Sequence, residues 1–181
     1  MLIFIGCKLK DHNKDIIEES IDKIANKFSI VSLNKKVSPH VTLKAPFEIK
    51  DEDLKKLDEF LIKFSSTQKE ISFEIDKVSN FDKKVIFLEL NGSKKIEGFS
   101  NQLTLGLKNF PFILFSKIEK VGKNIFHVTL AKKITENFNE INNYTNSLKI
   151  PPLNGNLDNI TICEYKDNKW EIYREYNLLS K

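Results

Sequence analysis

The 181-residue sequence predicts an α+β protein with two similar lobes, each a small antiparallel sheet with helices on its outer face. Apolar residues alternate in short segments typical of strands, and recur every three or four positions in longer segments typical of helices. The order strand, helix, strand, helix, strand occurs twice, with corresponding elements about 80–90 residues apart. Because consecutive elements usually lie close in space, we expect two lobes related by a pseudo-two-fold axis.

The first half covers approximately residues 1–82. Its expected elements, in order, are a strand over 2–9, a helix over 11–28, a strand over 37–44 that Pro46 ends, a helix with Asp51 as its candidate N-cap, and a strand over 71–75.

The second half covers approximately residues 83–181. Its expected elements are a strand over 85–90, a helix capped by Ser93, a strand over 126–131, a helix capped by Thr135, and a strand from Leu157 that forms a hairpin with 170–176 across 166–169. The Phe-rich segment 110–115 is either a buried strand or a mobile apolar cover. We expect the two lobes to interleave around a central cleft within a single domain, 1–181.

Composition is that of an ordinary soluble globular protein, with 40% hydrophobic and 30% charged residues and a net charge of +4. No apolar run is long enough to span a bilayer and no secretory signal is present, so we expect a cytoplasmic monomer. Cys7 and Cys163 lie in predicted strands; buried free thiols are expected, with a disulfide as the alternative, and their spacing suits no zinc site. Arg174 is the only arginine, so a bound phosphate would contact lysine, hydroxyl, imidazole or backbone N–H groups.

One tetrapeptide, His-Val-Thr-Leu, occurs at residues 40–43 and again at 127–130, and uses two of the three histidines. Both copies follow the first helix of their half. In a strand, side chains two positions apart point to the same face, so each histidine projects with its threonine while the valine and leucine face the core. If the lobes pack about a pseudo-two-fold axis, the two polar pairs meet in one cleft.

Such a cleft suits phosphodiester hydrolysis. The reaction needs a base for the attacking water and an acid for the leaving oxygen, and His40 and His127 can hold opposite protonation states near neutral pH. The hydroxyls of Thr42 and Thr129 can donate to the non-bridging phosphate oxygens. This chemistry requires no metal and no cofactor. A single His-x-Thr is usually a packing or surface feature, but two matched copies favour catalysis; His12, in a polar connection, is expected to be exposed and without a role.

These motifs resemble those of the two-histidine (2H) phosphoesterase superfamily, which includes the bacterial RNA 2',3'-cyclic phosphodiesterases also known as 2'-5' RNA ligases. Residues 39–47 resemble the extended first motif of the family and residues 126–130 the second. The resemblance implies a bilobal fold and the metal-independent opening of cyclic phosphodiesters. RNA ends or small cyclic nucleotides would then be the substrates.

Side chains near the motifs are further candidates for substrate binding. Lys44 is four positions after His40 and would share its face in a regular strand, where it could contact a second phosphate; a solvated lysine is the alternative. Lys132 is five positions after His127 and falls on the opposite face unless the strand twists or ends. Phe47 is a candidate to stack on a base, with a core position as the alternative, whereas Phe126 should point away from the cleft.

Other functions remain open. The same pocket could act on linear 2',5'- or 3',5'-oligonucleotides or on another cyclic phosphate metabolite, with the choice set by loops such as 29–38 and 110–125. A non-catalytic RNA-binding module is the alternative of a different class. ATP-dependent ligation is disfavoured because the six glycines form no phosphate-binding loop.

Overall fold

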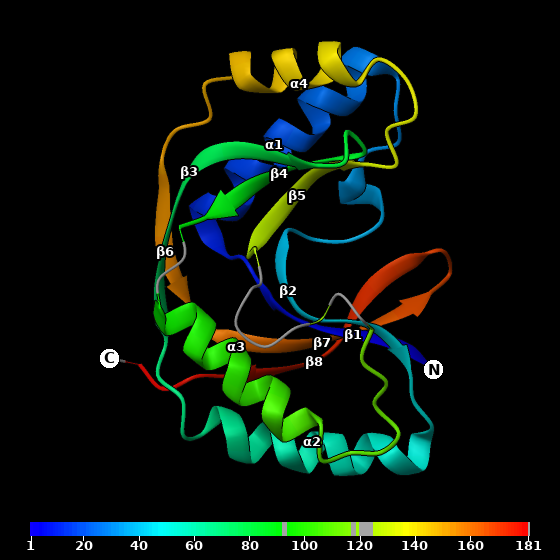
Figure 1. Ribbon diagram of the computed structural model, residues 1–181, viewed down its shortest axis with the longest axis vertical. Coiled ribbons are helices and arrows are strands. Elements are labelled where there is room, and N and C mark those ends of the chain that lie inside the picture. Colours follow the sequence, from blue (N-terminus) through cyan, green and yellow to red (C-terminus); the bar gives the residue numbers. More distant parts are fainter. Residues whose placement is uncertain (92–93, 117–118, 120–124, 181) are drawn as a thin grey trace.

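A computed structural model describes residues 1–91, 94–116, 119 and 125–180. They form two four-stranded antiparallel sheets with four α-helices, which confirms the α+β class (Figure 1). In chain order the elements are β1 (Leu2–Lys8), α1 (Asp11–Phe28), a 3-10 turn (Leu33–Lys35), β2 (His40–Glu48), α2 (Asp51–Ser65), β3 (Ile71–Phe81), β4 (Val85–Leu90), α3 (Lys94–Leu107), β5 (His127–Lys132), α4 (Phe138–Ser147), β6 (Leu153–Leu157), β7 (Asn159–Lys166) and β8 (Lys169–Asn177).

The two sheets exchange strands between the sequence halves. One sheet has the order β2-β1-β7-β8 and the other β5-β4-β3-β6. β3, the last strand of the first half, therefore pairs with β4 of the second half, and β7 pairs with β1. Each lobe takes strands from both halves, so the sheets do not coincide with the two sequence halves.

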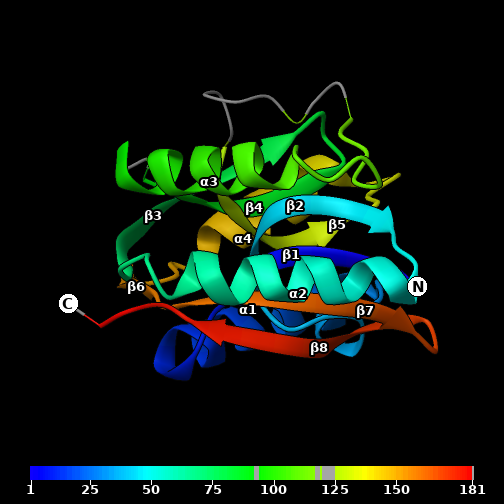
Figure 2. The ribbon, with the colours of Figure 1, turned by 90° about the horizontal axis from the view of Figure 1, so that it is seen from below.

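The helices pack in pairs on the outer sides of the two sheets (Figures 1 and 2). α1 lies against β5, β6 and α4, and the Phe28 and Tyr144 rings meet edge-on at 5.5 Å. α2 lies against β7 and β8, and its Phe64 ring is 5.6 Å from Phe99 of α3. α1 follows β1 but packs against β5 and β6 of the other sheet. α3 follows β4 and packs against α2, the helix that covers the sheet of β7 and β8. The helices therefore cross between the lobes as the strands do.

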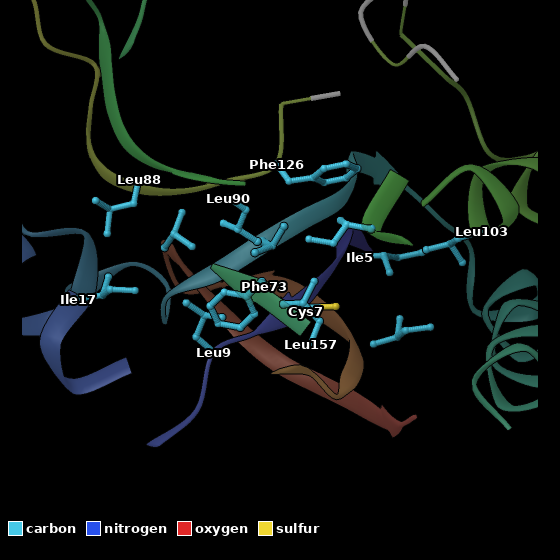
Figure 3. Packing of buried hydrophobic residues seen from close by; sticks show 14 of the residues in the cluster. Ile5, Cys7, Leu9, Ile17, Phe73, Leu88, Leu90, Leu103, Phe126 and Leu157 are labelled. Carbon is cyan, nitrogen blue, oxygen red and sulfur yellow. The ribbon is translucent and has the colours of Figure 1, made fainter. Parts of the chain in front are cut away.

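One continuous apolar cluster joins the lobes (Figure 3). It includes fully buried residues from both sheets, among them Ile5 of β1 and Leu157 of β6, and from the helices, among them Ile17 and Leu103. Each Å² of apolar surface that is removed from water stabilises the folded state by roughly 25 cal/mol. Because the cluster is shared, neither lobe has a separate core, and the relative position of the two sheets is fixed by packing.

Several predicted boundaries are wrong. β2 begins at His40 and continues through Pro46 to Glu48. A proline is tolerated there because β2 is an edge strand, where one N–H is not needed for the ladder. Asp51 is the first residue of α2 and Lys50 precedes it as the cap, while α4 begins at Phe138 after Asn137 rather than at a Thr135 cap.

Two further expectations concern loops. Residues 110–115 form neither helix nor strand, so the buried-strand prediction is wrong; Ile113 is buried but Leu114 is 77% exposed. Ser93, the predicted cap of α3, lies outside the described residues. The hairpin between β7 and β8 is confirmed, and Asp167 and Asn168 have the positive φ values of a type I′ turn.

The two cysteines are free thiols, which the sequence analysis preferred over a disulfide. Cys7 and Cys163 are both free and buried, as expected. Burial raises the pKa of the Cys163 thiol to about 12. Among the described residues, no helix has the length and apolar character needed to cross a membrane.

A pair of glycine substitutions tests the strand packing beneath the first motif. A Cβ added to Gly6 of β1 would lie 2.7 Å from the carbonyl oxygen of Val41, a backbone atom that cannot move aside cheaply. Gly6→Ala should lower the free energy of unfolding by about 1–3 kcal/mol. Gly98 of α3 has no neighbour within 4 Å of such a Cβ among the described residues, so Gly98→Ala should raise it by about 0.5–1 kcal/mol through helix propensity. Urea denaturation of both variants measures the difference, and equal stabilities would contradict the register of β1 and β2.

Candidate active site

The two motif strands lie next to each other. β2 and β5 are the edge strands of their respective sheets, and the two edges are in contact, although no ladder joins them in the part of the chain that the structure describes (Figure 1). Val41 and Val128 are buried, whereas both histidines are half-buried on the opposite face. The expected alternation therefore holds through each histidine, valine and threonine.

Both imidazoles are oriented by the same local hydrogen bond. Nδ1 of His40 lies 2.8 Å from the carbonyl oxygen of Ser38, and Nδ1 of His127 lies 2.9 Å from that of Ile125. A carbonyl oxygen can only accept, so Nδ1 carries the proton and donates it in each ring. Nε2 is consequently the nitrogen left to exchange a proton with a ligand. The repeated bond two residues upstream gives the two lobes the same tautomer.

Aromatic rings fix the histidines and remove water from them. Phe4 of β1 lies 4.7 Å from the His40 ring, centroid to centroid. Phe87 and Phe81 lie 4.7 and 5.1 Å from the His127 ring. These contacts account for much of the burial of both imidazoles and shift their protonation equilibria.

Burial lowers the pKa of both histidines. The pKa of His40 falls to about 4, chiefly through burial, and the charges of Lys132 and His127 lower it further against the raising effect of the Ser38 carbonyl. Burial also lowers the pKa of His127, where the Ile125 carbonyl and Glu89 act in the opposite direction. Both rings are therefore neutral at pH 7 in the free protein. The two environments differ in charge, because His40 faces a lysine while His127 faces a carboxylate.

A cavity of about 170 Å³ lies at the junction of the lobes. Its polar lining includes His40 and Thr42 from β2 and Thr129 and Lys132 from β5. At about 30 Å³ for each water molecule, it has room for roughly five or six waters, which suits a phosphate group. His127 does not itself line this cavity, although Thr129 of the same strand does, and a protonated His127 would lower the pKa of His40.

A bulge in β2 explains why Lys44 is absent from this site. Thr42 pairs with Gly6 and Lys44 pairs with Ile5, so Leu43 is an extra residue on the β2 side of the ladder. Directly paired residues share a face, which puts Lys44 on the side of Ile5, opposite to the cavity.

The predicted substrate contacts at Lys44 and Phe47 are therefore wrong. Lys44 is 2% exposed, and its ammonium donates to Glu119 at 2.9 Å and to the Ala45 carbonyl at 3.1 Å. It also lies over the rings of Phe47 and Phe115, at 5.1 and 4.8 Å. Phe47 is 6% exposed and belongs to the core cluster, so the core alternative is correct. Phe126 is likewise a core residue, as expected.

The corresponding bulge in β5 brings Lys132 into the site. Thr129 pairs with Phe87 and Ala131 with Ile86, so Leu130 is the extra residue, and Lys132 pairs with Val85 on the same face as Thr129. Regular alternation placed this lysine on the wrong side. The sequence signal for Lys132 is the Thr-Leu pair that occurs in both motifs. If one leucine is a bulge residue, the repeat predicts a bulge at the other, and that bulge moves Lys132 to the cavity side.

The remaining candidates lie elsewhere. Arg174 pairs with Asp58 on α2, so the only arginine is not available to this cavity. His12 is exposed and lines a different hollow near Lys10 and Asp158. Within the described part of the chain, no group of three His, Cys, Asp or Glu side chains could hold a metal ion.

The fold and paired His-x-Thr strands define a two-histidine phosphoesterase. The sequence matches the 2'-5' RNA ligase superfamily over residues 14–169, and the chain belongs to that superfamily. No curated protein sequence matches it significantly.

Solved structures share its fold at low identity. TT0787 of Thermus thermophilus is 14% identical with a TM-score of 0.69, and the alignment covers 98% of both chains. E. coli LigT complexed with 3'-AMP is 15% identical with a TM-score of 0.66 over 97% of both chains. Usb1 of Kluyveromyces marxianus is 14% identical with a TM-score of 0.54 over 98% of both. Membership of the superfamily supports a phosphodiesterase-type activity.

Replacing the buried lysine tests the correction at Lys44. Lys44→Met keeps the apolar stem but leaves the Glu119 carboxylate without its cation. The free energy of unfolding should fall by roughly 1–3 kcal/mol, less than for a fully buried pair, because Glu119 is partly exposed. Urea denaturation measures this loss. An unchanged free energy of unfolding, together with weaker phosphate binding, would show that Lys44 contacts the substrate phosphate after all.

Histidine titration followed by NMR tests the electrostatics of the cleft. His40 should titrate with a pKa of about 4, and Lys132→Gln should raise that pKa because a nearby cation is removed. The titration of His127 should change less, since Lys132 is not among the groups that shift its pKa. Equal shifts of both histidines, or none at His40, would contradict the placement of Lys132.

Proposed function

We propose that the protein is a metal-independent phosphodiesterase that hydrolyses 2',3'-cyclic phosphate ends of RNA or small cyclic nucleotides. The observation that carries this proposal is the contact between the two His-x-Thr edge strands: both imidazoles are held by the same kind of hydrogen bond, and His40, Thr42 and Thr129 line one phosphate-sized cavity. Two acid–base groups and two hydroxyls are what cyclic phosphodiester hydrolysis requires.

The substrate phosphate would occupy the cavity between the threonines. The hydroxyls of Thr42 and Thr129 would donate to the non-bridging oxygens, and the Lys132 ammonium would offset their negative charge. An ammonium serves here as a point charge, in the absence of an arginine fork among the cavity-lining residues.

The two histidines would have different roles. His40, neutral at pH 7 and with the strongly lowered pKa, would accept the proton of the attacking water as its oxygen bonds to phosphorus. His127 would donate a proton to the ribose oxygen as the bond from phosphorus to that oxygen breaks. Glu89, opposite His127 in the ladder, and the anionic phosphate both raise the pKa of His127 and so favour its protonated form. Proton exchange with solvent restores the starting state.

A solved structure with the same fold supports the class of substrate. LigT, which has the same fold, is described in complex with 3'-AMP, a nucleotide with its phosphate on the 3'-oxygen, and this supports a ribose phosphate as the ligand here. Linear 2',5'- or 3',5'-oligonucleotides and other cyclic phosphate metabolites are alternative substrates for the same groups. A cytoplasmic location and a monomeric state stay predictions from the sequence.

A non-catalytic RNA-binding module is the second candidate function. Its mark would be salt-sensitive RNA binding without product. The duplicated tautomer arrangement favours turnover, because binding a phosphate does not require two imidazoles that each leave Nε2 free.

Single histidine substitutions test the proposal. His40→Ala and His127→Ala should each lower kcat on a 2',3'-cyclic nucleotide by at least about 10²–10⁴-fold, because each removes one proton-transfer step. His12→Ala, which changes an exposed histidine outside the cavity, is the matched control and should retain full activity. Chromatography of the products in EDTA measures turnover, and thermal denaturation checks folding. Full activity in His40→Ala/His127→Ala, or loss of activity in EDTA, would defeat the proposal.

A further inference from the structure

A charged residue lies directly opposite each motif histidine. In the ladder between β1 and β2, Lys8 pairs with His40, and in the ladder between β4 and β5, Glu89 pairs with His127. Directly paired residues share a face of the sheet, with their Cβ atoms roughly 4.5–5.5 Å apart, so each charged side chain lies on the same side as its imidazole. The two lobes therefore have the same arrangement with opposite charges.

The two charges are not equally available to their histidines. The Lys8 ammonium lies 2.5 Å from the carboxylate of Glu175, so its charge is offset within that ion pair. The Glu89 carboxylate has a looser partner, because the Lys77 ammonium lies 3.6 Å away on a side chain that is 66% exposed. An exposed ion pair longer than a hydrogen bond is weak, so the field of Glu89 still acts on His127.

Lys77, Glu89 and His127 form one row across three neighbouring strands (Figure 1). Lys77 of β3 pairs with Glu89 of β4, which pairs with His127 of β5. The row runs from an exposed ammonium, through a carboxylate side chain that is 31% exposed, to a half-buried imidazole. The rings of Phe81 and Phe87 lie against the imidazole and exclude water there, and a charge acts more strongly where water is excluded.

The other elements packed on β5 bring different groups toward this strand. β2 carries His40, whose pKa responds to the charge of His127. α1 packs with apolar residues, of which Ile17 and Ile21 are buried. Among the described residues, Glu89 is the charged side chain that acts on the protonation of His127, and it raises the pKa of that imidazole against the lowering effect of burial.

We infer that the row Lys77–Glu89–His127 makes His127 the proton donor, with Glu89 as a positioning residue that favours the protonated imidazole and Lys77 as the outer cation that limits this effect. This inference rests on the proposed function. His127 begins the reaction protonated, gives its Nε2 proton to the leaving ribose oxygen and ends neutral, while Glu89 keeps its charge throughout. Lys8 gives His40 no such support, because a cation disfavours a protonated imidazole. The cross-strand partners, rather than the identical motifs, therefore separate the acid from the base.

The pH dependence of kcat tests the role of Glu89. Glu89→Gln keeps the size of the side chain and removes its charge, so the protonated form of His127 should be lost at a lower pH. The basic limb of the kcat profile on a 2',3'-cyclic nucleotide should move down by about 0.5–1 pH unit, which corresponds to about a three- to tenfold loss of kcat on that limb. Glu89→Asp keeps a carboxylate and should restore most of the lost activity.

Lys77→Gln should act in the opposite direction. It removes the outer cation, so the basic limb should move up, by roughly 0.2–0.5 pH unit because exposed charges interact weakly. If the ion pair between Lys77 and Glu89 were only structural, both substitutions would break the same contact and would have the same effect.

Glu164→Gln is the matched control. Glu164 is also a half-buried glutamate in a strand, but it lies in the other sheet and pairs with the core residue Ile3. It should leave the pH profile unchanged, and thermal denaturation should show that all four variants fold.

NMR titration of His127 gives a measurement that does not depend on turnover. In the free protein, Glu89→Gln should lower the pKa of His127 and Lys77→Gln should raise it. Shifts in the same direction, no shift in Glu89→Gln, or an unchanged basic limb in that variant would overturn the inference and leave the proposed function intact. Absence of turnover by the unchanged protein would refute the proposed function itself, and the donor role of His127 with it.

Discussion

The exchange of strands between the two sheets is the constraint on which the rest of the structure depends. Because β3 leaves the first half to pair with β4, and β7 returns to pair with β1, the sheets cannot separate without breaking ladders in both lobes. The shared core fixes them further. The free edges that remain adjacent are β2 and β5, the two strands that carry a His-x-Thr motif.

The two lobes are alike in backbone but not in charge. Each motif strand has a bulge after its threonine, yet the bulge in β2 sends Lys44 to an internal ion pair with Glu119 while the bulge in β5 brings Lys132 to the cavity. Lys132 lowers the pKa of His40, whereas Glu89 acts to raise the pKa of His127. The two imidazoles therefore differ in their protonation equilibria. In the proposed reaction, this difference would let the duplicated motif supply a distinct acid and a distinct base.

Sequence patterns predicted the elements and the motif pairing but not the details of register. Alternation correctly put Val41 and Val128 in the core and the histidines on the opposite face. It failed at Lys44 and Lys132, because a bulge adds one residue and reverses the side chains that follow it, and no periodicity marks where that occurs. Interleaved lobes were expected, but the particular strands that are exchanged were out of reach, because local patterns do not say which sheet a strand joins.

Phosphate titration observed at the histidine rings tests most directly whether the two motifs share one site. If the two adjacent motif strands form one anion site, inorganic phosphate should shift the NMR signals of His40 and His127 along a single saturation curve. The signals of His12 should not move with them. Two different saturation curves, or a response of only one of the two rings, would contradict a common cleft.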